Sequence, residues 1–130
     1  MIEKMRLYGL RGAVCVSENT PQAIQQAVSE LADELFARNS YSPEDIVSIQ
    51  FTMTSDLTAL NPAAALRRSN QAALAASCAL FCSTEPPVDG ALPRTIRVLV
   101  TAYAEKPPVH VYTGGAEVLR PDWARTQAER

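Results

Sequence analysis

Four residues with charged or hydrogen-bonding side chains lie in or beside apolar segments of this sequence, where they could form a binding site for a small anion. Arg11 lies within LYGLRGAVCV (residues 7–16), Arg97 within RTIRVLV and Tyr112 within HVYTGG, and Glu85 follows the apolar segment ALFCST. An arginine cannot be deprotonated in a protein, and its planar fork matches a carboxylate through two hydrogen bonds. A guanidinium inside an apolar strand is costly without a partner. The pattern therefore points to an arginine-lined site for a small polyanion.

Each of these residues also has an ordinary structural explanation, and residue type alone does not decide between the two. Arg97 can be a solvent-facing strand residue, Tyr112 a core or interface aromatic, and Glu85 a loop carboxylate. Cys82 is more often a small core residue than a reactive thiol. Two prolines after Glu85 restrict its backbone toward extended geometry, which suits a carboxylate that must be aimed. Arginines outnumber lysines ten to two, and genomic GC bias favours such an excess without any functional cause, so the positions of the arginines are more informative than their number.

Composition excludes several function classes. The chain has 130 residues, 47% hydrophobic and 20% charged, and a net charge of −2, which is typical of one soluble globular domain and a poor match for nucleic-acid binding. No apolar run approaches the roughly 18 residues of a membrane span. The N-terminus lacks a signal-peptide pattern, so we expect a cytoplasmic protein. The three cysteines and the one histidine, Cys15, Cys78, Cys82 and His110, lack metal-ligand spacing, and we expect neither a metal nor a disulfide framework.

The elements that must position these residues can be predicted from periodicity and turn signals. Thr20 and Pro21 start an amphipathic helix that carries apolar residues at helical spacing and ends near Asn39. The segment 42–45 is predicted to be a capped single turn, and Asn61 with Pro62 is predicted to start a short helix. Strands are predicted at residues 5–16, 46–53, 78–84 and 94–104, followed by a short strand around HVY, a Gly-Gly turn and an extended tail.

This order of elements predicts one domain over residues 1–130, of the α/β (α+β) class. Strand, long helix, strand, short helix and three further strands indicate a mixed β-sheet covered by one long amphipathic helix. The sequence contains no internal repeat or low-complexity segment that would mark a second domain.

Six short motifs give more specific information about function than composition does. LRGAVCVSENT, PAAALR, FCSTE, RTIRVLV, HVY and VLRPD occur in this order and spacing, and together they resemble the small trimeric monofunctional chorismate mutases of bacteria. The resemblance runs from about residue 6 to residue 122. It implies a homotrimeric pseudo-α/β barrel with active sites between subunits. It also implies a Claisen rearrangement of chorismate to prephenate, in aromatic amino acid biosynthesis, with no cofactor and no covalent intermediate.

The resemblance also implies a role for individual residues. Arg11 and Tyr112 would hold a substrate carboxylate, and Arg97 would lie beside the ether oxygen. Cys82 and Glu85 would face the ring hydroxyl. Arg67 would lie at the entrance, Leu119 and Arg120 would belong to a closing tail that is flexible over about 121–130, and the backbone of Phe81, Cys82, Ser83, Thr84 and Glu85 would line the pocket.

The chemistry gives a reason for these residue types. In the pericyclic transition state, breaking of the C–O bond runs ahead of formation of the C–C bond, so negative charge gathers on the ether oxygen and the ring becomes electron-poor. A cation at that oxygen stabilises the transition state more than the ground state, and Glu85 would complement the ring. Cationic clamps on the two substrate carboxylates would hold the compact diaxial conformer. The reaction needs no general acid, base or nucleophile.

Some positions depart from the family pattern and leave alternatives open. Asn61 stands where the family often has an aromatic residue, Ala64 stands where lysine is frequent, and the segment from Arg97 to Tyr112 is short. These changes bear on the entrance and so on substrate affinity. A non-catalytic trimeric metabolite-binding or regulatory relative is the alternative function. A small-molecule deaminase of similar trimeric shape is a third possibility that the ordered motifs do not favour.

Overall fold

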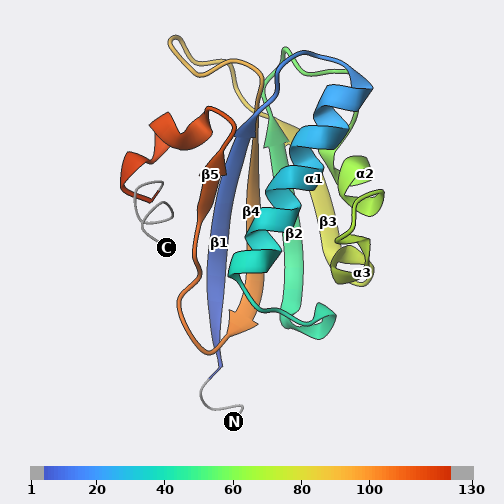
Figure 1. The fold of residues 1–130 in the computed structure, drawn as a ribbon, viewed down its shortest axis with the longest axis vertical. Coiled ribbons are helices and arrows are strands. Elements are labelled where there is room, and N and C mark those ends of the chain that lie inside the picture. The colour runs from blue at the N-terminus through green and yellow to red at the C-terminus, as the bar shows by residue number, and fades with distance from the viewer. Residues whose placement is uncertain (1–4, 124–130) are drawn as a thin grey trace.

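A five-stranded mixed sheet forms one layer of the molecule, and helices cover one of its two faces (Figure 1). The structure is a computed structural model that describes residues 5–123. The strand order is β3-β2-β4-β1-β5, in which β4 runs antiparallel to β1 and β2, and the two edge strands pair in parallel with their neighbours. The strands are β1 (Arg6–Cys15), β2 (Ile46–Met53), β3 (Ala79–Thr84), β4 (Thr95–Ala104) and β5 (Val111–Thr113). The predicted class, with a mixed sheet, is confirmed.

The long helix α1 (Pro21–Arg38) starts where the sequence predicts. The Thr20 hydroxyl accepts a hydrogen bond from the Ala23 N–H at 3.1 Å, and Pro21 occupies the first turn, where its missing N–H costs nothing. The helix buries one stripe of apolar residues against the sheet. Its buried residues are Ile24, Ala27, Val28, Leu31, Ala32 and Leu35.

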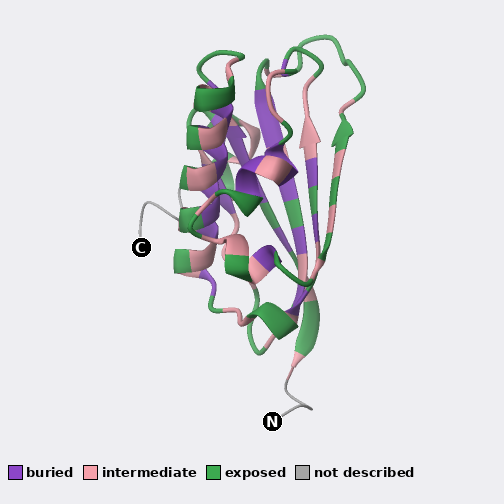
Figure 2. Cartoon of the chain, turned by 90° about the vertical axis from the view of Figure 1, so that its right-hand side faces the viewer, coloured by how far each residue is buried: buried purple, intermediate pink, exposed green. Residues whose placement is uncertain are grey.

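Shorter helical segments complete the covered face. The predicted capped turn is the single turn η2 (Pro43–Asp45), where the N–H and the hydroxyl of Ser42 both donate to the Asp45 carboxylate at 2.9 Å. The helix α2 (Pro62–Arg67) is capped by the Asn61 side chain as predicted. The helix α3 (Ala72–Ala75) was not predicted, and it shares the cover of β2 and β3 with α2. Figure 2 shows the buried residues gathered between these helices and the sheet. No helix among residues 5–123 is long and apolar enough to cross a membrane.

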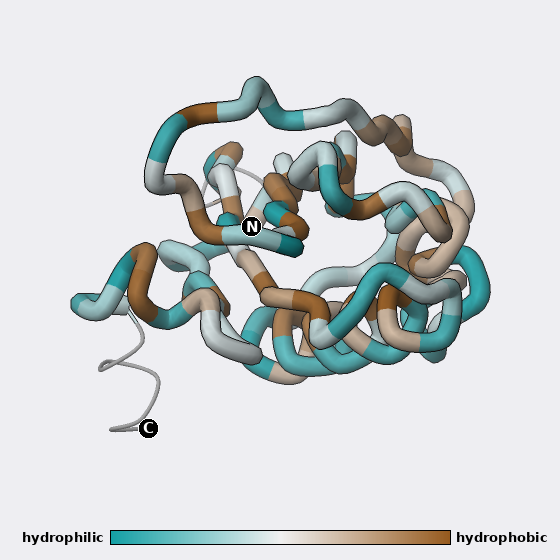
Figure 3. The backbone as a smooth tube through the Cα atoms, turned by 90° about the horizontal axis from the view of Figure 1, so that it is seen from above, coloured by the Kyte–Doolittle hydropathy of each residue, from teal (hydrophilic) through white to brown (hydrophobic). Residues whose placement is uncertain are grey.

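The other face of the sheet is open over most of its area, and its residues alternate with those of the core. In β4, Ile96, Val98, Val100 and Ala102 are buried, so Arg97 and Leu99 point to the opposite side. Large apolar residues on this open face are solvent-exposed, namely Leu7, Phe81, Leu99 and Tyr103. The 85–94 loop between β3 and β4 also extends on this side, away from the helices (Figure 3).

Arg11 belongs to this open face, which corrects the expectation of an arginine within a buried strand. Leu10, Gly12 and Val14 point toward the helices and are buried, whereas Arg11 is exposed. A Cβ atom on Gly12 would lie 2.9 Å from the Val111 carbonyl oxygen and 3.3 Å from Leu35, so only glycine fits there. The apolar run therefore has two faces, and the guanidinium does not enter the core.

The C-terminal segment covers part of the open face instead of forming the predicted extended tail. The Gly114–Gly115 turn leads into η3 (Ala116–Leu119), and a further helical turn covers residues 121–123. Gly115 has φ 99°, a left-handed conformation that favours glycine. Ala13, Tyr112 and Ala116 form a small second core here, with Leu119 and Trp123 packed against it. Of the tail predicted over 121–130, residues 124–130 lie outside the described residues.

Candidate active site

An open hollow of about 220 Å³ lies on the uncovered face of the sheet, over the middle of β1, β2 and β4. Its lining includes Arg11, Gln50, Thr52, Arg97, Leu99 and Tyr112. Three of the residues singled out from the sequence are therefore brought together by the alternation and register of neighbouring strands. Arg11 pairs with Leu99 across β1 and β4, and Arg97 pairs with Thr52 across β4 and β2.

Glu85 reaches this hollow from the end of β3. Its N–H donates to the Met53 carbonyl at 2.8 Å, which extends the β2–β3 pairing by one residue beyond the strand. The Arg97 Nε donates to Glu85 Oε2 at 3.0 Å, and the Thr52 hydroxyl donates to the same oxygen at 2.6 Å. The side chain of Glu85 is 17% exposed and that of Arg97 is 41% exposed, so this is a partly shielded ion pair.

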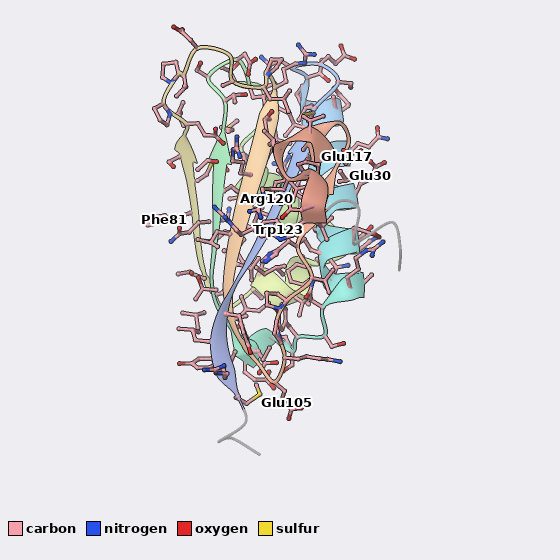
Figure 4. The ribbon with its side chains drawn as sticks, turned by 90° about the vertical axis from the view of Figure 1, so that its left-hand side faces the viewer. Glu30, Phe81, Glu105, Glu117, Arg120 and Trp123 are labelled. Carbon is pink, nitrogen blue, oxygen red and sulfur yellow. The ribbon has the colours of Figure 1, made fainter. Side chains whose placement is uncertain are left out.

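A cluster of rings and guanidinium groups borders the hollow on the side of β5. The Arg11 N–H donates to His110 Nδ1 at 3.0 Å, and the His110 ring lies 4.0 Å from the Trp123 ring between centroids. Arg120 stacks over Trp123, with its guanidinium carbon 3.3 Å from the ring centroid, as Figure 4 shows. The Tyr112 ring lies 5.6 Å from Trp123. The end of the described chain thus lies directly beside two of the predicted substrate-binding residues.

His110 is electrostatically suited to stay neutral. Burial lowers its pKa, and the positive charges of Arg11 and Arg120 lower it further. An imidazole that accepts the Arg11 N–H through Nδ1 carries no proton on that nitrogen.

The segment before His110 is held by the buried Asn39, whose side chain accepts the Val109 N–H at 2.8 Å and donates to the Val109 carbonyl at 2.9 Å. The end of α1 therefore positions the start of β5.

A second group of predicted residues lies toward the opposite edge of the sheet. Arg67 lies at the C-terminal end of α2 and is exposed, on the helical side of the sheet. Cys82 also points to that side, with its Sγ 3.6 Å from the Met53 Sδ, and burial raises the pKa of its thiol. Phe81 projects from β3 away from the helices (Figure 4). The remaining two, Ser83 and Thr84, are exposed on the edge strand.

The predicted residues therefore fall into two groups that one chain does not bring together. Arg11, Arg97, Tyr112 and Glu85 meet at the hollow, with Leu119 and Arg120 beside them. The group along β3 and α2 lies at the edge opposite β5. Cys82 and Glu85, which were expected to face one ligand group together, point to opposite sides of the sheet within this chain.

Sequence reasoning missed four residues at or beside the hollow, which are Gln50, Thr52, His110 and Trp123. The alternation of β2 already places Gln50 and Thr52 on one side of the strand, but it does not indicate which partner strands lie beside them. His110 belongs to the HVY motif, and its contact with Arg11 spans 99 residues of chain. Trp123 lies just beyond the VLRPD motif.

Comparisons with known proteins of similar sequence and structure point to one family. Residues 7–123 match the family model "Chorismate mutase type I". Chorismate mutase AroH of Thermus thermophilus is 40% identical over 123 residues, which cover 92% of this chain and 98% of the relative. Chorismate mutase AroH of Bacillus subtilis is 33% identical over 126 residues, covering 95% and 97%. The solved structure of a chorismate mutase from Clostridium thermocellum superposes with a TM-score of 0.78 at 38% identity and covers 85% of this chain and 98% of its own. A family match over most of the chain and two relatives of this similarity show that the chain belongs to the type I chorismate mutase family.

Proposed function

We propose that the protein isomerises chorismate to prephenate at the open-face hollow, with Arg97 as its main catalytic residue. Family membership supports the reaction, and the observation that carries the site is the guanidinium of Arg97 in a hollow that Arg11 and Tyr112 also line. Among the described residues, Arg97 makes one side-chain hydrogen bond, through Nε to Glu85. Its terminal N–H groups are left to meet a ligand.

The proposed mechanism is electrostatic. As the C–O bond of chorismate breaks, the ether oxygen gains negative charge, and the Arg97 guanidinium stabilises that charge where it appears. Arg11 and Tyr112 hold a substrate carboxylate and so restrain the compact reactive conformer. Glu85 places a negative charge near the ring as the ring becomes electron-poor. Because none of these residues donates a proton to carbon or removes one from it, the site works without general acid–base chemistry.

The activity is tested directly by the loss of chorismate absorbance in the presence of purified protein. We expect saturable turnover that is unchanged after treatment with EDTA and dialysis, since the proposed mechanism uses only side chains of the chain. Loss of the rearrangement in the EDTA-treated sample alone would contradict the mechanism. Chorismate binding without turnover, measured by calorimetry on the same sample, would favour the alternative of a non-catalytic relative.

We also infer that the active unit is a homotrimer in which one subunit supplies the hollow and its neighbour supplies β3 and α2. The support is the division of the predicted residues into two groups at opposite edges, which a neighbour could reunite. In addition, Leu7, Phe81, Leu99 and Tyr103 leave an exposed apolar band on the open face, and β3 is an uncovered sheet edge. A closed cyclic assembly would cover both.

The trimer predicts a mass of about three times the chain mass of 14.1 kDa by light scattering at micromolar concentration. Phe81→Lys should shift the protein toward monomer and abolish most of the activity, because Phe81 is 74% exposed in the single chain and would be buried by a neighbour. A wild-type protein that is monomeric yet fully active would refute the shared site.

We infer a cytoplasmic location from the state of the cysteines and from the proposed substrate. The three cysteines all lie within the described residues and are free, which fits a reducing compartment. The substrate that we propose is a small polar metabolite.

A further inference from the structure

We propose that Thr52 is a positioning residue for the rearrangement, which acts by fixing the carboxylate of Glu85 beside Arg97. This inference rests on the proposed function, because it concerns how the Glu85–Arg97 pair is presented to the substrate. Neither the sequence motifs nor the family resemblance singles out Thr52.

The register of three strands places Thr52 between the two charged partners. In β2 it pairs with Arg97 of β4 on one side and with Ser83 of β3 on the other. Glu85 follows two residues after Ser83, and its backbone N–H is bound to Met53, the residue next to Thr52. The side chain of Glu85 extends back over β2, so its carboxylate lies next to the Thr52 hydroxyl. This hydroxyl donates to Glu85 Oε2 at 2.6 Å.

The two donors on Oε2 restrict how the carboxylate can turn. Among the described residues, the side chain of Glu85 accepts hydrogen bonds from Thr52 and Arg97 only, and both go to Oε2. The second oxygen, Oε1, accepts no hydrogen bond from a described residue. An unrestrained carboxylate beside an arginine tends toward the bidentate arrangement, in which both oxygens bind two N–H groups of the fork. We infer that Thr52 opposes that arrangement and keeps the terminal N–H groups of Arg97 available to the ether oxygen.

The position of Thr52 does not point to a packing role. Its side chain is half-buried and lines the hollow, whereas its two neighbours in β2, Phe51 and Met53, pack on the side of the helices. Valine has the same shape and the same preference for strands. Thr52→Val therefore removes the hydroxyl with little change in packing.

The test compares the kinetics of Thr52→Val, Thr52→Ala and Thr52→Ser with the wild type. We expect Thr52→Val and Thr52→Ala to lower kcat by about tenfold, in line with the loss of one hydrogen bond to a charged group. KM should stay within about twofold, because the hydroxyl does not itself hold the substrate. Thr52→Ser restores the hydroxyl and should recover kcat to within about threefold. Thr101→Val is the matched control, since it makes the same change on the same open face of the sheet, in β4, where Thr101 pairs with Ser48 of β2.

A double-mutant cycle separates positioning from a structural effect. In a Glu85→Gln background, Thr52→Val should lower kcat by less than about twofold, because the charged group on which it acts is gone. One outcome would overturn the proposal and leave the proposed function intact. In it, the wild type turns over chorismate and Glu85→Gln loses activity, but Thr52→Val and Thr52→Ala do not. An equal loss in both backgrounds would also overturn it, since the residue would then act on the fold. Absence of turnover in the wild type would instead refute the proposed function, and this inference with it.

Discussion

Arg97→Ala is expected to lower kcat by at least about 10²- to 10³-fold, with a much smaller change in KM. Removal of one preorganised donor at a developing oxyanion costs about 2.7–4 kcal/mol, and loss of a full charge can cost more. The charge on the ether oxygen exists only as the C–O bond breaks, so the loss falls on kcat; a contact made equally in the ground state would fall on KM. Initial rates of chorismate loss over a range of substrate concentrations measure the two separately.

Two further variants test whether charge or size matters at position 97. Arg97→Lys keeps the charge but is shorter and lacks the fork, so it should recover only part of the loss. Arg67→Ala is the contrast, because an exposed residue at the proposed entrance meets ground state and transition state alike and should chiefly raise KM. If Arg97→Ala keeps kcat within about threefold and folds normally, Arg97 is only a strand residue, and Arg11 becomes the better candidate for the ether oxygen.

The ion pair with Glu85 requires one more control. Truncating Arg97 leaves a carboxylate that is 17% exposed without its cationic partner, and that charge could itself repel a dianionic substrate. The double variant Arg97→Ala/Glu85→Gln removes this charge. If kcat stays low in the double variant, the loss comes from the missing cation and not from the unpaired carboxylate.

Much of the fold could be predicted because its signals are local. The Thr20 hydroxyl accepts an N–H of the first turn of α1, Pro21 has no N–H to satisfy there, and the Asn61 side chain accepts the Ala63 N–H of α2. Both helix starts are therefore encoded within a few residues. The strands follow from alternation and from β-forming residues. By contrast, α3 has no capping side chain that would mark its start. The segment of η3 and the helical turn after it packs against Ala13 and Tyr112. The contacts with Ala13 span about a hundred residues of chain, which no local pattern expresses.

In the candidate site, too, local sequence patterns predict some features, and long-range contacts decide the others. Arg97 lies on the same side of β4 as Leu99 and Thr101, and the period of two along a strand is enough to place it there. The same period of two places Cys82 and Glu85, three residues apart, on opposite faces of one chain. The contact between Thr52 and Glu85 depends on the parallel register of β2 and β3, and register is a tertiary property. The roles assigned to the site residues stay predictions until variants are measured.

Arg11→Ala is expected to reduce kcat/KM by about 10²-fold, mainly through KM. Removing one partner of a desolvated charge pair costs about 2–5 kcal/mol, and the proposed partner here is a substrate carboxylate that is present in ground state and transition state alike. The structure holds Arg11 in place for this role, since its backbone N–H is bound to His110 and its guanidinium lies 5.9 Å from the Trp123 ring. Steady-state kinetics with chorismate, together with calorimetric titration of prephenate, separates lost affinity from lost chemistry.

The controls for Arg11 come from its own strand. Arg6→Ala makes the same change five residues earlier, where Arg6 pairs with Ala104 at the end of the sheet away from the hollow, and it should leave both constants within about twofold of the wild type. Arg11→Lys keeps a charge without the bidentate fork and should recover only part of the affinity. If Arg11→Ala instead lowered the turnover rate by the same factor and left prephenate affinity unchanged, the carboxylate role would be contradicted. That result would place Arg11 at the breaking C–O bond, where Arg97 is now proposed. The paired measurements on Arg97 and Arg11 therefore decide which cation binds the ether oxygen and which binds the substrate carboxylate.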